Sequence, residues 1–325
     1  METIIKNDAN EQIEKPSTPD IPQTPLEAFQ DAVLKKHNET ELYQLDIKSL
    51  GPWSASKYKA LIKCPFQFYL KYILKIKVPD GLAPRSDPIS ALVGSAAHRI
   101  LEHILLGKSV EKAYQLTKKE FINETLTEEV WAEKVDVLNY NITKFKDRID
   151  SFDRANPIKR VLTELRVGIN DKFEPTGFFS EDVWIRGVID LVLVLECLDV
   201  IILDHKTGGG QGPITPYKEQ LDWYKVLYQF GIDKSRGVQT AVHFIGEGEV
   251  KMAEYSKASD IENSLKNLIV MSLEGAIDTL KSVGYFKHIR GNLCKYCEFD
   301  NIGCKSGAFK EIEKQSKKWI EIKAI

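Results

Sequence analysis

The sequence lacks long hydrophobic runs, an excess of one charge and an abundance of cysteine, and each absence excludes a class of protein. The longest apolar candidate, 191–203, is interrupted by Glu196 and Asp199 and is shorter than the roughly 18 residues of a membrane-spanning helix. The 45 Lys and Arg residues nearly balance 47 Asp and Glu residues, which argues against a globally basic nucleic-acid-binding protein but leaves local patches open. Five cysteines in 325 residues are too few for a disulfide scaffold.

The first residues also lack the apolar core of a secretory signal, and Glu2 adds an early acid. We therefore expect a cytoplasmic protein, in the host cytoplasm if the source is viral, with reduced cysteines and no membrane association. What is present is a hydrophobic share of 43% over 325 residues, which supports a large folded core.

Three regions differ in composition. Residues 1–49 begin with a polar stretch that contains several prolines, so we expect a largely disordered N-terminal tail with one short helix over 26–36. The region 50–304 carries the motifs described below and is expected to form the main domain. The region 305–325 is rich in lysine and is expected to be a C-terminal helix or tail.

Hydrophobic periodicity predicts helices first, a sheet in the middle and helices at the end. Helices are predicted over 54–77 with a bend at Pro65, and over 91–106, 110–123, 128–155, 216–230 and 258–283. Strands are predicted over 160–167, 182–196, 200–206 and 238–245. This order indicates an α/β or α+β protein with a single central sheet, mostly antiparallel, with one helix inserted between strands.

The most informative stretch is a hairpin predicted from two hydrophobic runs, 187–196 and 200–206. If it turns near Cys197, Asp190 and Asp204 lie opposite each other, and Lys206 projects from the same face as Asp204. Two carboxylates at that separation repel each other unless a divalent cation lies between them, and such ligands suit Mg²⁺ or Mn²⁺. The metal would polarise a phosphoryl oxygen and lower the pKa of a bound water, while Lys206 would orient that water or stabilise the developing charge.

The alternative is a solvent-exposed hairpin with scattered charges and an ordinary salt bridge. It fits less well because both acids interrupt nearly continuous runs of Val, Ile and Leu, where a charge is costly unless it is used. Glu164, in the preceding strand, is a weaker candidate because many strands carry one Glu.

Cysteine is scarce but gathered near the C-terminus. Cys294 and Cys297 form a C-x-x-C motif, and Cys304 follows after six residues. Cys64 is the candidate for a fourth ligand, and Cys197 is a poorer choice because it belongs to the hairpin turn. Four thiolates can hold zinc or an iron–sulfur cluster, and spacing alone cannot decide between them. Reduced thiols without a ligand are the third possibility.

A local basic patch offsets the nearly neutral net charge. The segment 54–78 contains six lysines and no acid, and aromatic residues are interleaved with the lysines. Lysines neutralise phosphates and aromatic rings stack on unpaired bases, although most of these rings are expected in the core. The candidate DNA contacts are Lys57, Lys59, Lys63 and Lys71.

Several motifs, in this order, resemble the PD-(D/E)xK nuclease superfamily, in the RecB-type branch that includes the AddB nuclease domain and the CRISPR-adaptation exonucleases. The stretch that begins Gly94-Ser-Ala-Ala-His98 resembles its helical histidine motif, and Gly187-Val-Ile-Asp190 resembles its G-x-x-D. Asp204-His-Lys-Thr-Gly resembles its D-x-K-T-G, and Gln220-Leu-Asp-Trp-Tyr resembles its Q-x-x-x-Y. The motifs run over 54–304, roughly three-quarters of the chain.

This resemblance implies a restriction-endonuclease-like core, a small central mixed sheet flanked by helices with helical additions. It also implies a role for six side chains: metal ligands His98, Asp190 and Asp204, catalytic Lys206, and active-site Gln220 and Tyr224. It favours a 4Fe–4S cluster over zinc, because in the iron–sulfur members one cysteine precedes the nuclease core and three follow it. The cluster would then join the two ends of the chain. A usual family spacing has five residues between the last two cysteines, and this sequence has six.

The sequence therefore predicts a metal-dependent deoxyribonuclease, acting as an exonuclease on single-stranded or free DNA ends in recombination, repair or replication. Two alternatives are a structure-selective endonuclease and a catalytically silent DNA-binding or assembly subunit. The chain has no G-x-x-x-x-G-K-[ST] motif, so a helicase, recombination or integration partner would have to supply a motor.

Overall fold

The structure is a computed structural model that describes residues 24–39, 46–79, 82, 88–197, 199–208, 212–292 and 294–319. Most of the tail predicted over 1–49 lies outside these residues. Within the described part of the chain, no helix combines the length and the apolar character needed to cross a membrane.

A six-stranded mixed sheet forms the centre of the molecule, in the order β2-β1-β3-β4-β5-β6. The strands are β1 (Ile158–Ile169), β2 (Pro175–Thr176), β3 (Ile185–Leu195), β4 (Val200–Lys206), β5 (Val238–Phe244) and β6 (Glu249–Met252). Only β4 and β5 pair in parallel, because helix α8 (Thr215–Gly231) crosses between them. The α/β architecture and the antiparallel β3–β4 hairpin predicted from the sequence are confirmed.

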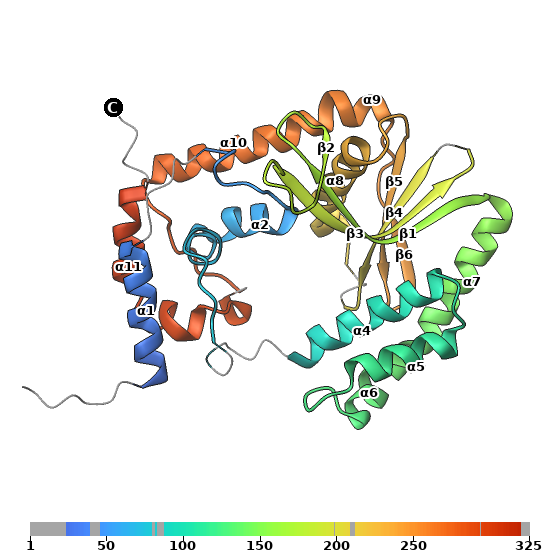
Figure 1. Cartoon of the computed structure of the whole chain (residues 1–325), viewed down its shortest axis with the longest axis horizontal. Helices are drawn as coiled ribbons and strands as arrows, with labels where there is room; N and C mark the ends of the chain where they lie inside the picture. The colour runs from blue at the N-terminus through green and yellow to red at the C-terminus, as the bar shows by residue number, and fades with distance from the viewer. Residues whose placement is uncertain are drawn as a thin grey trace, which may run out of the picture.

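Helices cover both faces of this sheet (Figure 1). One face packs against α4 (Pro88–Leu105), α5 (Val110–Phe121), α6 (Glu128–Lys134) and α7 (Asn139–Ala155), with the 3₁₀ turn η2 (Asp136–Leu138) between the last two. The single helix predicted over 128–155 is therefore divided at Val135, and the division allows Trp131 and Ile142 both to be buried.

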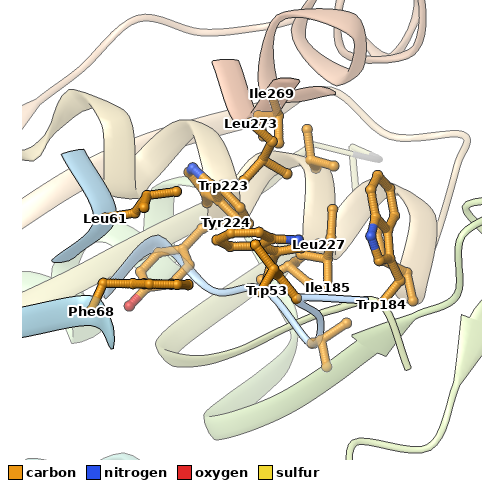
Figure 2. Close-up of a cluster of buried hydrophobic side chains, with 14 of the residues drawn as sticks. Trp53, Leu61, Phe68, Trp184, Ile185, Trp223, Tyr224, Leu227, Ile269 and Leu273 are labelled. Carbon is orange, nitrogen blue, oxygen red and sulfur yellow. The ribbon is translucent and has the colours of Figure 1, made fainter. Parts of the chain in front are cut away.

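The other face packs against α8 and a long helical stretch made of α9 (Ala258–Asp260), η3 (Ile261–Leu265) and α10 (Lys266–Val283). The segment predicted as one bent helix over 54–77 consists of α2 (Ala55–Lys63), α3 (Pro65–Phe68) and η1 (Tyr69–Ile73). Ser54 caps α2 by accepting from the Lys57 N–H, and the break falls at Pro65, which has no N–H to continue the helix. Figure 2 shows side chains from α2, β3, α8 and α10 meeting in this core, with Trp53 and Phe68 beneath them.

The N-terminal helix of the described residues lies beside the C-terminal part of the chain (Figure 1). The C-terminal part forms η4 (Cys294–Tyr296), η5 (Asp300–Cys304), α11 (Lys310–Gln315) and η6 (Ser316–Trp319). Helix α1 (Pro25–Glu39) packs on it: Gln30 Nε2 donates to the Ile302 carbonyl at 2.6 Å, and Val33 is fully buried. The short helix predicted over 26–36 is thus present as α1, which is longer at both ends and has a buried face. Phe309 and Ile312 are buried in the same core. Helix α11 therefore packs as part of the domain.

Close packing between α8 and β1 depends on Gly231. A Cβ at this position would lie 2.2 Å from Cγ1 of buried Val167. We expect Gly231→Ala to lower the free energy of unfolding by about 1–3 kcal/mol, the usual cost of overpacking. Gly275 on α10 has open space around its Cα, so Gly275→Ala should raise stability by about 0.5–1 kcal/mol. Urea unfolding of both variants checks this; a shift in the same direction for both would contradict the packing argument.

Candidate functional site

The candidate site lies where strands β3 and β4 separate. Their paired register runs from Val194↔Val200 to Leu191↔Leu203 and stops there, so the next residues, Asp190 and Asp204, face each other across the split. Asp190 Oδ2 accepts the His205 N–H at 2.7 Å, and this bond takes the place of a missing ladder bond. The carboxylates are thus brought together by the hairpin register, but on strands that have begun to diverge.

Glu164 supplies a third carboxylate from β1. The pairs Thr163↔Leu191 and Leu165↔Ile189 place it level with Asp190. Its φ of 47° lies in the left-handed region, a strained conformation for a residue with a side chain that costs about 1–3 kcal/mol. Strain of this kind inside a strand interrupts the regular alternation of side chains. It persists because the pairing on both sides of Glu164 holds the backbone in place.

His98 reaches these acids from helix α4. Its Nδ1 lies 3.8 Å from Glu164 Oε1 and 3.7 Å from Asp190 Oδ2, and the three side chains offer ligand atoms within 4.8 Å of one another. His98 Nε2 is 3.1 Å from the His205 carbonyl oxygen, so it donates there and leaves Nδ1 to face the carboxylates. One imidazole nitrogen and two carboxylates form a donor set that suits Mn²⁺ or Mg²⁺.

Asp204 is held by partners of its own. It is 1% exposed; Oδ2 lies 2.6 Å from Lys206 Nζ, and Oδ1 accepts from Gln220 Nε2 at 3.0 Å and from Tyr224 OH at 3.4 Å. Gln220 also donates to Tyr224 OH at 2.6 Å, so α8 presents a connected pair to the carboxylate. Of the predicted ligands His98, Asp190 and Asp204, the first two therefore lie together with Glu164 as the third member of the group. Asp204 is instead paired with Lys206.

The pKa values reflect this crowding of buried charge. Burial, with Asp204 adding to it, raises the pKa of Asp190 to about 6, and burial also raises the pKa of Asp204 against the pull of Lys206. Burial opposes charge on His98, but Glu164 and Asp190 outweigh it and raise the His98 pKa. A cation at this place would relieve the repulsion between these carboxylates.

Two cavities open on these side chains. One of about 690 Å³ lies on the α4 side and is lined by His98, Glu164 and Thr207 among others. One of about 450 Å³ lies on the α8 side and is lined by Gln220 and Tyr224. The α4-side cavity thus reaches Glu164 and His98, and the α8-side cavity reaches the two side chains that contact Asp204.

The lysines predicted to contact DNA do not behave alike. Lys57 turns inward, donates to the Leu50 carbonyl, and lies 5.3–5.8 Å from the centroids of the Trp53, Phe68 and Tyr72 rings. Burial lowers the pKa of Lys57 to about 8. In this position Lys57 supports the core, and the DNA contact predicted for it stays a prediction. Lys71 pairs with Glu298 at 2.9 Å.

Four of the five cysteines share one cavity of about 460 Å³, which Cys64, Cys294, Cys297 and Cys304 line together with Lys59, Lys63 and Lys71. Burial raises the pKa of Cys297 to about 11, and the neighbouring thiols of Cys64 and Cys294 add to this rise. Burial likewise raises the pKa of Cys64 and of Cys304. Cys197 is exposed in the β3–β4 turn, away from this group. The four thiols therefore line one cavity, but among the described residues only His98, Glu164 and Asp190 bring their possible ligand atoms within 4.8 Å of one another.

Comparison with known proteins identifies the family of the chain. The model of the PD-(D/E)XK nuclease superfamily matches residues 52–304. The chain belongs to this superfamily, which implies a hydrolase that cuts nucleic acid with divalent metal ions. No curated protein matches the sequence. A solved structure described as "Crystal structure of SSO0001" is 13% identical and covers 86% of this chain and 96% of its own, with a TM-score of 0.32. A score this low does not establish a common fold.

Glu164 is the site residue that the sequence undervalued, and it can be tested by metal binding alone. We expect Glu164→Gln to weaken Mn²⁺ binding at least tenfold, on the order of the loss seen when groups around a metal are removed, with the thermal midpoint of unfolding preserved or raised. Calorimetric titration of the metal-free protein measures this. Glu181→Gln, a change at an exposed acid outside the site, is the matched control. Equal Mn²⁺ affinity in both variants would remove Glu164 from the ligand set.

Proposed function

We propose that the protein is a deoxyribonuclease of the RecB-type branch that degrades single-stranded DNA from a free end. The observation that carries this proposal is the donor group of His98, Glu164 and Asp190 beside the Lys206–Asp204 pair. Its activity would belong to DNA recombination, repair or replication. A helicase, recombination or integration partner would bring the ends to the site.

Each side chain has a distinct part in the proposed reaction. A bound Mg²⁺ or Mn²⁺ would polarise the phosphoryl oxygen and lower the pKa of the attacking water. Lys206 Nζ, fixed by Asp204, would orient that water and stabilise charge on the phosphoryl oxygens. Gln220 and Tyr224 hold the Asp204 carboxylate and thereby fix Lys206. They are positioning residues in this scheme, because their polar atoms face Asp204.

A substitution at Lys206 should distinguish hydrolysis of DNA from binding of DNA. We expect Lys206→Ala to reduce the cleavage of end-labelled single-stranded DNA at least about a hundredfold while the affinity for DNA is kept, because the lost ammonium acts on the reacting phosphate. Lys172→Ala, at an exposed lysine of the β1–β2 turn, is the control and should cleave normally. Gel analysis in Mn²⁺ and Mg²⁺ measures both.

A circular substrate distinguishes the modes of cleavage. Linear single strands should be degraded and covalently closed circles should survive. Cleavage of the circles would show an endonuclease, and wild-type protein that binds DNA but cuts no substrate would leave only a binding or assembly role. Normal activity of Lys206→Ala would overturn the assigned role of that lysine.

We also propose that Cys64, Cys294, Cys297 and Cys304 bind a 4Fe–4S cluster, with zinc as the alternative. Support comes from their shared cavity and from the order of one cysteine before the nuclease motifs and three after them. The cluster would connect α2 to the C-terminal turns and so stabilise the domain, with no part in hydrolysis. The domain would then extend over 50–304, as expected from the sequence, together with the packed α1 and α11.

Colour and metal content test this assignment. Protein purified without oxygen should be brown, with iron and sulfide in equal amounts, and Cys304→Ser should lose the colour and melt at a lower temperature. Cys197→Ser, the matched control at the exposed cysteine, should remain brown. A colourless preparation that contains zinc and no iron would replace the cluster with a zinc site. Full stability of Cys304→Ser would contradict a stabilising role for any ligand there.

A further inference from the structure

Two neighbouring aromatic rings, one exposed and one half-buried, lie next to the α8-side cavity. Phe178 and Phe179 lie in the loop between β2 and β3, with ring centroids 4.9 Å apart and ring planes at 79°. Phe179 exposes 75% of its surface, and Phe178 is half-buried. Two adjacent large aromatic rings at the rim of a cavity form a ready contact surface for a flat partner.

Two guanidinium groups flank these rings. Arg186 Cζ lies 5.1 Å from the Phe178 centroid and 5.9 Å from that of Phe179, and Arg166 Cζ lies 6.0 Å from both. Arg186 Nη1 donates to the Phe178 carbonyl at 3.2 Å, which ties the loop to β3. Within the described residues, neither guanidinium has a carboxylate partner in an ion pair. The surface therefore combines aromatic faces with positive charge that the protein itself does not neutralise.

The same surface leads directly to the candidate active site. Phe178 and Arg186 line the cavity of about 450 Å³ whose other wall includes Gln220 and Tyr224, the partners of Asp204. Arg186 also precedes Asp190 by four residues on β3, about 13 Å along a strand. Lys59 adds a further cation to the cavity wall. Glu219 lies there too, with Lys59 and Lys63 offsetting its charge.

We propose that Phe178, Phe179, Arg166 and Arg186 form a stacking platform for the unpaired bases of single-stranded DNA, which then passes along the α8-side cavity to the acids. Every base has a face that can stack on an aromatic ring or a guanidinium, so such a platform binds without reading sequence. Bases within a duplex are already stacked on each other and cannot use it. This proposal rests on the proposed function and specifies single-stranded DNA as the substrate that the site binds.

Binding measured without cleavage tests the platform separately from the nuclease activity. In the Lys206→Ala background, fluorescence anisotropy would report the affinity for a labelled single strand and for a blunt duplex of the same sequence. We expect the double change Phe178→Ala and Phe179→Ala to raise the Kd for the single strand about five- to hundredfold and to leave the Kd for the duplex unchanged. Phe179→Trp should keep the single-strand affinity, because the larger ring still stacks.

Matched variants distinguish stacking at this platform from a general loss of folding or of DNA affinity. Tyr140→Ala removes a ring with the same 75% exposure from α7, outside the cavity, and should change neither affinity. Phe179→Ala alone, at the exposed ring, serves if the double variant does not fold. Unchanged single-strand affinity in Phe179→Ala, equal losses for single strand and duplex, or no single-strand binding by the parent protein would each overturn the platform. Single-strand binding that depends on the rings, in a wild-type protein that cuts no DNA, would instead keep the platform and refute the proposed nuclease.

Discussion

Repulsion among buried carboxylates is the constraint on which the rest of the site depends. Asp190 and Asp204 stand at one level of two adjoining strands, where burial makes their charge costly, and the exposed Glu164 lies level with Asp190 on the next strand. Every polar group that surrounds them reduces this cost. His98 faces Glu164 and Asp190, and Lys206 faces Asp204. A divalent cation at His98 would serve the same electrostatic need and add the chemistry of hydrolysis.

The fold explains how such a group can be assembled at all. The sheet supplies the acids from three strands, while helices on its two faces supply the groups that control them: α4 brings His98 and α8 brings Gln220 and Tyr224. Opening the β3–β4 ladder at Asp190 creates the space between the carboxylates, and the bond from the His205 N–H keeps the split from widening. The site therefore lies where the β3–β4 pairing stops, and the helices packed on both faces of the sheet hold this irregular region in place.

The sequence could predict the features of the site that depend on nearby residues. It could not predict those that depend on packing between distant segments. The hairpin register that brings Asp190 opposite Asp204 follows from a turn near Cys197 between two hydrophobic runs, and the four-residue spacing of Gln220 and Tyr224 places them on one helix face. Glu164 could not be ranked in the same way, because its place depends on pairing with a distant strand and on a positive φ that no sequence pattern announces. The surroundings of Lys57 could not be predicted for a related reason: an acid-free stretch shows charge but not which lysine lies over a tryptophan and two other rings.

Helix α2 connects the parts of the molecule that carry the two proposals. Ser56 and Lys59 line the cysteine cavity and also the cavity that joins the aromatic platform to Tyr224. The helix begins at the Ser54 cap and ends at Cys64, so a ligand on that thiol would fix the helix at its C-terminal end. The position of Lys59 along the path proposed for a DNA strand then depends on how firmly Cys64 is held. A stabilising ligand among the cysteines, far from the acids in sequence and separate from the chemistry, would thereby shape the wall past which the strand moves.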